Sequence, residues 1–320
     1  MSSSESKRCW IIADNKAGMI NQAIGLAEAL GYPFEIKTNG LKWPWNLLTP
    51  FVRLPYSFCQ SEGTDELKPP WPDVIITCGR QSILPALWVK KMSKDKAFLI
   101  KIQNPQISLS LFDLVVTPQH DLITGSNVIQ TIGSLHRVTN DVLDKARLEW
   151  SETFKDLPKP IFSVIIGGNS KHYEMTPDKT EQFMSDLVTL AKKKGGSLCV
   201  TVSRRTPDFA RSIIAEKIKS VPHFFYEGEG PNPYFALMAF GDFLFVTEDS
   251  VSMVSEALST GKPTYLLPLE SKGSNKFKRF HDAVYKAGLA RPFTGTIEVY
   301  DYKPLYETKE IAERIKASLR

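Results

Sequence analysis

The amino-acid sequence predicts an α/β protein of two domains, each a doubly wound parallel sheet with helices on both faces. The chain has 320 residues, which is more than one typical domain holds and suits two. Short apolar runs alternate with segments of helical periodicity, an order typical of parallel strands joined by crossover helices. The runs are continuously apolar rather than alternating, which indicates strands buried on both faces.

Eleven apolar runs are predicted to form strands. Six lie in the first half of the chain, at residues 9–13, 34–38, 73–78, 97–102, 113–117 and 127–132. Five lie in the second half, at residues 161–166, 197–202, 223–226, 243–247 and 264–269. Helical segments are expected at residues 19–30, 80–92, 139–150, 178–194, 207–219 and 250–260.

The boundary between the two domains is predicted near residues 156–160. This stretch, Asp-Leu-Pro-Lys-Pro, is typical of an extended linker. We therefore expect one domain at residues 8–150, a second at 157–305 and a separate terminal helix at 306–320. Two Rossmann-like domains in tandem are expected to face each other across a cleft at the carboxyl ends of their sheets, where open α/β folds bind ligands.

Composition narrows the classes of partner. The net charge of +5 is mildly basic, which favours anionic ligands such as nucleotides or a membrane surface. A dedicated nucleic-acid-binding protein has a clustered excess of Lys and Arg residues, which this sequence lacks, so no nucleic-acid partner is expected. The four cysteines form no C-x-x-C pair and no Cys/His ligand spacing, so we predict no metal site and a reducing compartment. No apolar run approaches 18 residues and no signal-peptide pattern opens the chain, so a cytoplasmic protein is expected.

Polar residues follow two strands of the first domain and are candidates for catalysis. Asp14 and Asn15, directly after the first strand, can cap a helix or bind a ligand, and Gly18 permits close backbone approach. His120 and Asp121 follow the strand at 113–117, where a His–Asp neighbourhood can supply a general base. The alternative is that His120 is a structural turn residue.

Two loops of the second domain could bind an anion. Gly167 and Gly168 directly follow a strand, so their backbone N–H groups could face a phosphate, or the pair could simply form a tight turn. Ser203, Arg204 and Arg205 follow the strand at 197–202. Paired arginines can form bidentate hydrogen bonds to phosphates. The alternative is that these residues form an exposed basic loop.

The stretch TEDSVSMVSEALSTGKP, from Thr247, joins a predicted strand to a predicted helix. A hydroxyl in the first turn, the helix dipole and free N–H groups together make a phosphate site. At about 1.5 Å per residue, Glu256 lies about 6 Å along the helix axis from that first-turn hydroxyl. At this distance its carboxylate could accept hydrogen bonds from the two hydroxyls of a ribose. The alternative is that Asp249 or Ser250 is an ordinary N-cap and Glu256 is solvated.

Residues 41–58 are dense in aromatic side chains and contain two basic residues and three prolines. Such a segment can sit in a membrane interface as a peripheral contact. The alternative is a long loop that covers the core of the first domain.

The ordered motifs DNKAGMINQAIGLAEAL, TCGRQS, FDLVVTPQHD, NVIQTIGSLHRV, IGGNSKHY, SRRTP and VTEDSVSMVSEALSTGKP together resemble a known family. It comprises the bacterial relatives of the plant mitochondrial-fission "elongated mitochondria" family, described as glycosyltransferases of GT-B fold. The resemblance spans about residues 8–305. More remotely, the C-terminal half resembles the nucleotide-sugar domain of the peptidoglycan N-acetylglucosaminyltransferase.

The resemblance implies roles for particular residues. A nucleotide diphosphate sugar would be the co-substrate, with no bound metal or other cofactor. Its diphosphate would meet Gly167, Gly168 and the helix start at Ser250, Val251 and Ser252, and Glu256 would hold the ribose. The loops that supply Asn169, Ser203, Arg204, Arg205 and Asp249 would complete the donor site. Asn15, Gly18 and Asn21 would line the acceptor side, and the acceptor would be a lipid-linked or envelope glycan at the inner face of a membrane.

One departure from the family pattern concerns the base. Bacterial relatives usually read G-H-E-N-Q where this chain reads Gly18-Met-Ile-Asn-Gln22. Met19 cannot act as a base, so Asp14 or His120 would have to serve. The second hypothesis is therefore a non-catalytic adaptor of GT-B fold at a membrane surface. A sugar-nucleotide epimerase is disfavoured because no G-x-x-G-x-x-G fingerprint or Tyr-x-x-x-Lys pair follows the first strand.

Overall fold

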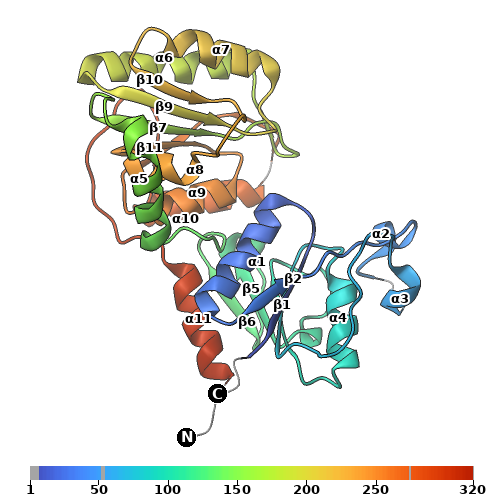
Figure 1. The fold of residues 1–320 in the computed structure, drawn as a ribbon. Coiled ribbons are helices and arrows are strands. Elements are labelled where there is room, and N and C mark those ends of the chain that lie inside the picture. The colour runs from blue at the N-terminus through green and yellow to red at the C-terminus, as the bar shows by residue number, and fades with distance from the viewer. Residues whose placement is uncertain (1–6, 52–54, 274, 320) are drawn as a thin grey trace, which may run out of the picture. The chain divides into compact units, whose positions relative to one another are not determined.

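The computed structural model describes residues 7–51, 55–273 and 275–319, which fold into two compact units (Figure 1). Unit 1 comprises the chain up to Arg137 together with the segment from Tyr306 onward. Unit 2 comprises Val138–Leu305.

Unit 1 is built on a six-stranded parallel sheet in the order β2-β1-β3-β4-β5-β6. Its strands are β1 (Cys9–Ala13), β2 (Phe34–Ile36), β3 (Val74–Cys78), β4 (Phe98–Ile102), β5 (Leu114–Pro118) and β6 (Val128–Thr131). Its helices are α1 (Ala17–Leu30), α2 (Trp45–Leu48), α3 (Tyr56–Cys59), α4 (Ile83–Met92) and α11 (Glu307–Ser318), with 3₁₀ turns η1 (Leu109–Leu111) and η2 (Gln119–Asp121).

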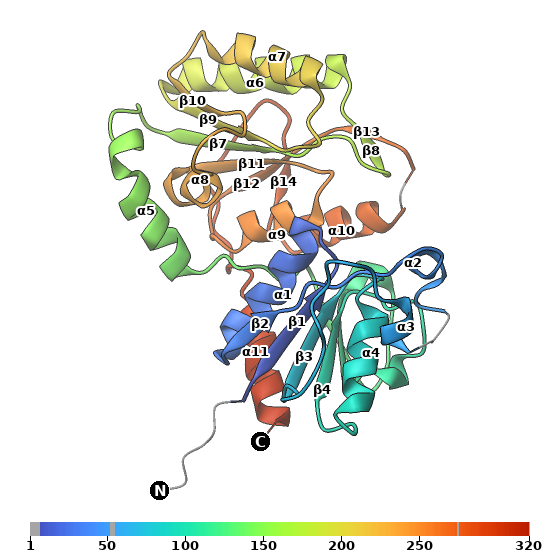
Figure 2. The same ribbon diagram turned by 45° about the vertical axis from the view of Figure 1, so that its right-hand side comes forward.

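Both faces of the unit 1 sheet are covered, as the continuous apolar runs predict. Successive side chains of a strand point to opposite faces. Accordingly, Ile11 packs in a cluster with residues of α1 and α11, whereas Ile12 packs with residues of α4. Figure 2 shows α1 and α11 on one side of this sheet and α4 on the other.

Unit 2 repeats this architecture with a second six-stranded parallel sheet in the order β10-β9-β7-β11-β12-β14. Its strands are β7 (Ile161–Ile166), β9 (Ser197–Val202), β10 (His223–Tyr226), β11 (Phe243–Thr247), β12 (Thr264–Leu267) and β14 (Arg291–Pro292). A small antiparallel pair joins β8 (Tyr173–Glu174) to β13 (Glu270–Ser271). Its helices are α5 (Asn140–Phe154), α6 (Pro177–Lys194), α7 (Asp208–Ile218), α8 (Tyr234–Phe240), α9 (Val251–Leu258) and α10 (Asn275–Lys286). Helices α6 and α7 cover one face of the sheet, and α8 and α9 lie on the other (Figure 2).

All eleven predicted runs form strands, and helix ends with strong local signals form where expected. Helix α6 starts at Thr176, whose hydroxyl accepts a hydrogen bond from the Lys179 N–H, with Pro177 in its first turn. It ends at Gly195 in the left-handed region, with φ of 67°. Helices α8 and α10 were not predicted.

The division into units differs from the predicted boundaries at both ends of unit 2. Helix α5, expected in the first domain, belongs to unit 2, where the Phe154 ring stacks on Phe240 with centroids 4.9 Å apart. Helix α11 belongs to unit 1 and buries Ile311 and Ile315 against the core that contains α1. Its Glu307 carboxylate accepts hydrogen bonds from the N–H groups of Ile132 and Gly133. The apolar face of a helix, not its distance from a linker, decides which core it joins.

Across the parts of the chain that the structure describes, no helix is both long and apolar enough to span a lipid bilayer.

The packing of α11 predicts a large effect of truncating its core side chains. Ile311 is 4% exposed, so Ile311→Ala should lower the free energy of unfolding by about 2–5 kcal/mol. Glu313→Ala, on the exposed face of the same helix, is the control and should stay within about 0.5 kcal/mol. Denaturant unfolding of the full chain measures both. Equal effects of the two substitutions would show that the helix does not belong to the core of unit 1.

Candidate functional site

Three loops of unit 2 that carry predicted site residues meet at one edge of the sheet. Strand β7 pairs in parallel with both β9 and β11, so the carboxyl ends of these three strands lie side by side. The Ser203 hydroxyl, after β9, donates to the carbonyl of Gly167, after β7, at 2.6 Å. The Gly168 N–H donates to the Asp249 carboxylate, after β11, at 3.2 Å. The structure therefore brings together residues that are far apart in the sequence.

The glycine pair serves close packing of the chain rather than offering free N–H groups. The Gly167 N–H donates to the Thr247 hydroxyl at 2.7 Å, and the Gly168 N–H is taken by Asp249. A Cβ atom on Gly167 would lie 2.3 Å from the Asp249 carboxylate oxygens, and one on Gly168 would lie 2.1 Å from the Arg205 carbonyl oxygen. The expectation that these two amides face an anion is therefore wrong for this structure.

Asp249 is a buried carboxylate that holds the loops together. Its side chain is fully buried, and it forms an ion pair with Arg205 at 2.7 Å. Burial raises the pKa of the Asp249 carboxyl, and the Arg205 guanidinium opposes that rise. Arg205 also donates to the Asn169 carbonyl at 3.3 Å, and the Asn169 side chain accepts from the Met175 N–H at 2.8 Å. Arg205 and Asn169 thus form contacts within the protein in this structure.

Arg204 differs from its neighbour. Its side chain is exposed, and the described part of the chain provides it with no hydrogen-bond or ion-pair partner. Of the predicted arginine pair, Arg204 is the one whose guanidinium is available for an anion.

Helix α9 starts as an ordinary capped helix. The Ser250 hydroxyl accepts a hydrogen bond from the Met253 N–H at 3.3 Å, so Ser250 is the N-cap, one of the two interpretations considered above. Val251 and Ser252 form the first turn and are half-buried. N–H groups in a first turn have no intrahelical partners, so those of Val251 and Ser252 could donate hydrogen bonds to an anion.

Glu256 is buried rather than solvated, and it has a partner that the sequence analysis did not identify. It is 8% exposed, and the Tyr234 hydroxyl donates to its carboxylate. Burial raises the pKa of Glu256 to about 7, and the hydrogen bond from Tyr234 opposes the rise. Tyr234 opens α8, whose start could have been inferred from Pro233 followed by an apolar run.

The opposite end of α8 is fixed by Lys262, which follows α9. Its ammonium donates to the carbonyls of Met238, Ala239 and Gly241 at 2.9, 2.6 and 2.6 Å. A cation at a helix C-terminus satisfies carbonyls that lack helical partners and interacts favourably with the dipole. Lys262 therefore holds the helix that presents Tyr234 to Glu256.

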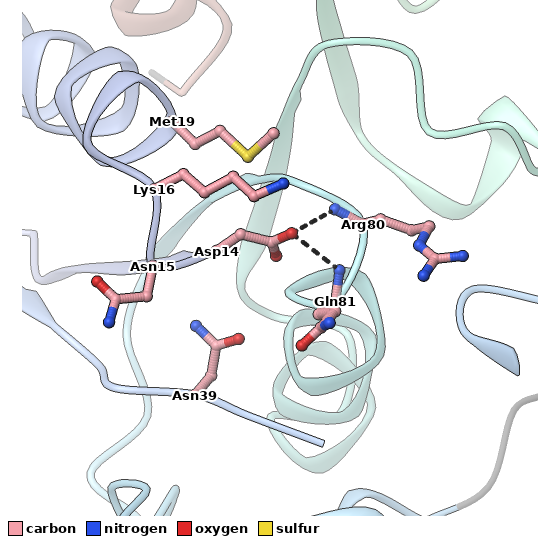
Figure 3. A pocket seen from close by; sticks show the side chains of 7 residues that line it. All are labelled: Asp14, Asn15, Lys16, Met19, Asn39, Arg80 and Gln81. Carbon is pink, nitrogen blue, oxygen red and sulfur yellow. Dashed lines mark hydrogen bonds between the residues drawn. The ribbon is translucent and has the colours of Figure 1, made fainter. Parts of the chain in front are cut away.

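Unit 1 contains a pocket of about 270 Å³ at the carboxyl end of β1 (Figure 3). Its lining consists of Asp14, Asn15, Lys16, Met19, Asn39, Arg80 and Gln81. The Asp14 carboxylate accepts hydrogen bonds from the backbone N–H groups of Ser82, Arg80 and Gln81 at 2.9, 3.1 and 3.4 Å. Gly79 permits this approach, because its φ is +107° and a Cβ atom there would lie 2.2 Å from the Asp14 Cγ. Asp14 therefore caps the start of α4 from a neighbouring strand.

The structure does not gather all the predicted acceptor-side residues. Asn15 lines the pocket, whereas Gly18 and Asn21 lie in α1 outside its lining. His120 is 6% exposed in η2 and is also absent from the lining. Asp121, beside it, accepts a hydrogen bond from the Thr117 hydroxyl at 2.9 Å. Of the two candidate bases, only Asp14 reaches this pocket. No cluster of three or more His, Cys, Asp or Glu side chains suited to a metal occurs among the described residues.

Comparison with known proteins identifies the family. The profile of the family described as Mitochondrial fission ELM1 matches residues 17–319.

The chain belongs to this family.

Two relatives illustrate the ELM1 likeness. The mitochondrial fission protein ELM1 of Arabidopsis thaliana is 32% identical over 275 residues, which cover 78% of this chain and 64% of the plant protein. An uncharacterized protein of Rickettsia prowazekii is 29% identical over 97% of this chain and 98% of its own length.

Solved structures of similar fold cover nearly the whole of this ELM1-family chain. The UDP-GlcNAc 2-epimerase of Neisseria meningitidis, bound to UDP-GlcNAc, has a TM-score of 0.57 at 13% identity and covers 98% of this chain and 99% of its own. The UDP-GlcNAc 2-epimerase of Methanocaldococcus jannaschii, in complex with UDP-GlcNAc and UDP, has a TM-score of 0.53 at 11% identity over the same shares. The predicted fold class is thereby confirmed: two Rossmann-like domains of the GT-B type.

These neighbours correct one exclusion. The sequence argument against an epimerase rested on a missing G-x-x-G-x-x-G fingerprint and a missing Tyr-x-x-x-Lys pair, whereas two epimerases share the fold of this chain.

The buried Glu256 predicts a specific pH dependence of stability. Its pKa in the folded state, about 7, lies above its usual value of 4.5, so the protonated carboxyl favours the folded state. This stabilisation is complete below pH 4.5 and is lost as the pH rises through 7. The glutamine of Glu256→Gln cannot titrate, so the variant does not lose this stabilisation. The free energy of unfolding of the variant minus that of the wild type should therefore increase by up to about 3 kcal/mol as the pH rises from 4.5 through 7. Denaturant unfolding at several pH values measures this difference.

The control for this prediction is Glu229→Gln, because Glu229 is exposed. The difference in stability between that variant and the wild type should not vary with pH. A flat difference for Glu256→Gln as well would mean that Glu256 is ionised in the folded protein throughout the range.

Proposed function

We propose that this protein is a metal-independent glycosyltransferase that moves a sugar from a nucleotide diphosphate sugar to an acceptor hydroxyl. The observation that carries the proposal is the meeting of three loops after β7, β9 and β11 in unit 2. They place a helix start and Arg204, which has no polar partner within the described ranges of the chain, at the edge of a parallel sheet where α/β folds bind ligands. The fold neighbours support a nucleotide sugar as the ligand, since their structures hold UDP-GlcNAc.

Each part of the donor would have its own partner in unit 2. Arg204 and the first turn of α9 would hold the diphosphate and stabilise the charge that develops on it as it leaves. Glu256 would accept hydrogen bonds from the ribose in addition to the one from Tyr234.

The acceptor hydroxyl would bind in the unit 1 pocket. In the transfer, the acceptor oxygen forms a bond to the anomeric carbon while the bond from that carbon to the diphosphate breaks. The proton of the hydroxyl passes to a base, and Asp14 is the candidate that lines the pocket. His120 is the second candidate.

The two arginines are expected to behave differently on substitution. Arg204→Ala should weaken binding of UDP or GDP by about 1–3 kcal/mol and leave stability unchanged, because only a ligand uses its guanidinium. Arg205→Ala should lower the melting temperature, because it leaves the buried Asp249 unpaired. Calorimetric titration and thermal unfolding separate the two effects, with the exposed Arg314→Ala as the control. Unchanged nucleotide affinity in Arg204→Ala would remove Arg204 from the site.

The ribose contact predicts sensitivity to the sugar hydroxyls of the nucleotide. The wild type should bind UDP more tightly than its 2′-deoxy analogue, by about 1 kcal/mol per lost hydrogen bond. In Glu256→Ala the preference should disappear, because the acceptor is gone. A preference that survives in the variant would show that another group reads the ribose.

A second candidate function is a non-catalytic adaptor. The observation that favours it is family membership, because the plant relative is named for mitochondrial fission. Incubation with nucleotide sugars and a lipid and glycan extract distinguishes the candidates. Sugar consumption that depends on the extract supports transfer, and an altered nucleotide sugar without extract identifies an epimerase. Nucleotide binding without turnover supports the adaptor.

A further inference from the structure

The lining of the unit 1 pocket carries more positive than negative charge. Lys16 and Arg80 are its basic residues, and Asp14 is its acid. The remaining lining residues are uncharged: Asn15, Met19, Asn39 and Gln81. The charge that a ligand meets there depends on whether each of the charged groups is already paired within the protein.

The Asp14 carboxylate is largely satisfied from inside unit 1. It accepts hydrogen bonds from three backbone N–H groups in the turn that leads into α4, at 2.9, 3.1 and 3.4 Å. A carboxylate offers about four acceptor positions, so about one remains for a ligand. The positive end of the α4 dipole also lies at this carboxylate and reduces the effect of its charge on the pocket.

A buried lysine compensates Asp14 further. Lys101 of β4 is 1% exposed, and its ammonium donates to the Ile102 carbonyl at 2.5 Å. Burial lowers the pKa of Lys101, whereas the charges of Asp14 and Asp121 act to raise it. A buried ammonium needs negative charge nearby, and these two carboxylates supply it. Part of the negative charge of Asp14 is therefore balanced by Lys101, which lies outside the pocket lining.

Lys16 is the cation of the lining that has no ionic partner. Its side chain is exposed, and no carboxylate in the described ranges of the chain lies within ion-pair distance of its ammonium. Figure 3 shows this side chain extended into the pocket between Met19 and Asp14. An unpaired ammonium at a pocket wall attracts an anion and can donate hydrogen bonds to it.

Arg80 keeps its charge although its guanidinium is held in place. It donates to the carbonyls of Asn46 and Leu47 at 3.0 and 3.3 Å, and a carbonyl carries no net charge. Both carbonyls belong to the predicted membrane-contact segment 41–58, of which residues 52–54 lie outside the described residues. Arg80 is thus a fixed positive charge in the lining.

Two carboxylates beside the segment that carries Asn39 do not pair with these cations. Asp65 accepts a hydrogen bond from the N–H of Thr38 at 2.7 Å. Glu35 forms an ion pair with Lys37. Neither carboxylate is part of the lining, so the lining keeps its positive excess.

Neutral hydrogen-bonding groups complete the pocket. The part of the chain that the structure describes offers no hydrogen-bond partner to the side-chain amides of Asn15 and Gln81. An amide side chain both donates and accepts, as the hydroxyl groups of a sugar require. An anionic group would pair with Lys16 through charge-assisted hydrogen bonds, which are stronger than neutral ones. The lining therefore suits a polyhydroxylated molecule that carries an anionic group.

We propose that the unit 1 pocket takes an acceptor that bears a phosphate ester or a carboxylate, and that Lys16 determines this specificity by binding the anionic group. Asn15 and Gln81 would bind hydroxyl groups of the same molecule. That the ligand is an acceptor rests on the proposed glycosyl transfer. The anion site itself stands on the charges of the lining.

Ligand-observed NMR titration of the full chain tests the inference with three probes. Glucose is neutral, glucose 6-phosphate carries a phosphate ester, and glucuronate carries a carboxylate on the same ring. The wild type should bind at least one anionic probe about tenfold more tightly than glucose, the effect of one hydrogen bond to a charged group. The probe that is preferred identifies which anion the pocket takes.

Variants assign the preference to the pocket. Lys16→Met should abolish it, because the substitution removes the ammonium and keeps a side chain of similar length. Lys91→Met is the matched control and should keep it, since Lys91 is an exposed lysine of α4 outside the lining. Arg204→Ala should also keep it, because the anion is bound in unit 1. Melting temperatures confirm that the variants fold.

The inference is overturned if the wild type binds neither anionic probe, if it binds all three probes alike, or if the preference survives in Lys16→Met. Loss of the preference in Arg204→Ala would also overturn it, by placing the anion in unit 2. UDP binding is measured on the same samples. An anion preference without UDP binding would retain the anion site and reject the proposed transfer, and UDP binding without the preference would reject the anion site alone.

Discussion

In both units, a carboxylate at the end of one strand packs directly against a glycine at the end of a neighbouring strand. In unit 1, Asp14 after β1 meets Gly79 after β3, and in unit 2, Asp249 after β11 meets Gly167 after β7. A Cβ atom on either glycine would fall within 2.3 Å of the carboxylate group. The two strand ends can approach only because a side chain is missing there, and the arrangement of each candidate site depends on that approach.

This constraint divides the polar residues at the sheet edges into two groups. Asp249, Arg205 and Asn169 form hydrogen bonds within the protein and hold the loops in place. Asp14 belongs to both groups, because it caps the start of α4 and also lines the pocket. Arg204 has an exposed side chain and no polar partner among the described residues, and Lys16 lines the pocket beside Asp14. A buried carboxylate such as Asp249 needs its partners, because an unpaired charge in the interior is strongly unfavourable. The residues that shape the site and those that can serve a ligand are thus neighbours in sequence with different roles.

The same distinction explains why the site could be predicted only in part. The three loops of unit 2 follow the strands after which the sequence analysis expected them, since polar residues at strand ends are visible in the sequence. The occupation of the Gly167 and Gly168 N–H groups was not predictable, because their acceptors lie 80 and 81 residues away. The roles of Tyr234 and Lys262 were not predicted for a similar reason. Tyr234 donates to Glu256 and Lys262 donates to carbonyls of α8, and only the folded chain brings these groups together.

The sequence by itself determined eleven of the strands, the ends of α6 and the family, because each of these depends on patterns within short stretches of the chain. Short continuous apolar runs favour buried strands, and Thr176 and Gly195 bound a helix through contacts within one turn. The tertiary structure alone decided that α5 joins unit 2, that α11 joins unit 1 and that Glu256 is buried beneath Tyr234. These outcomes depend on which apolar surfaces meet and which polar atoms are withdrawn from water, and both are properties of the folded chain.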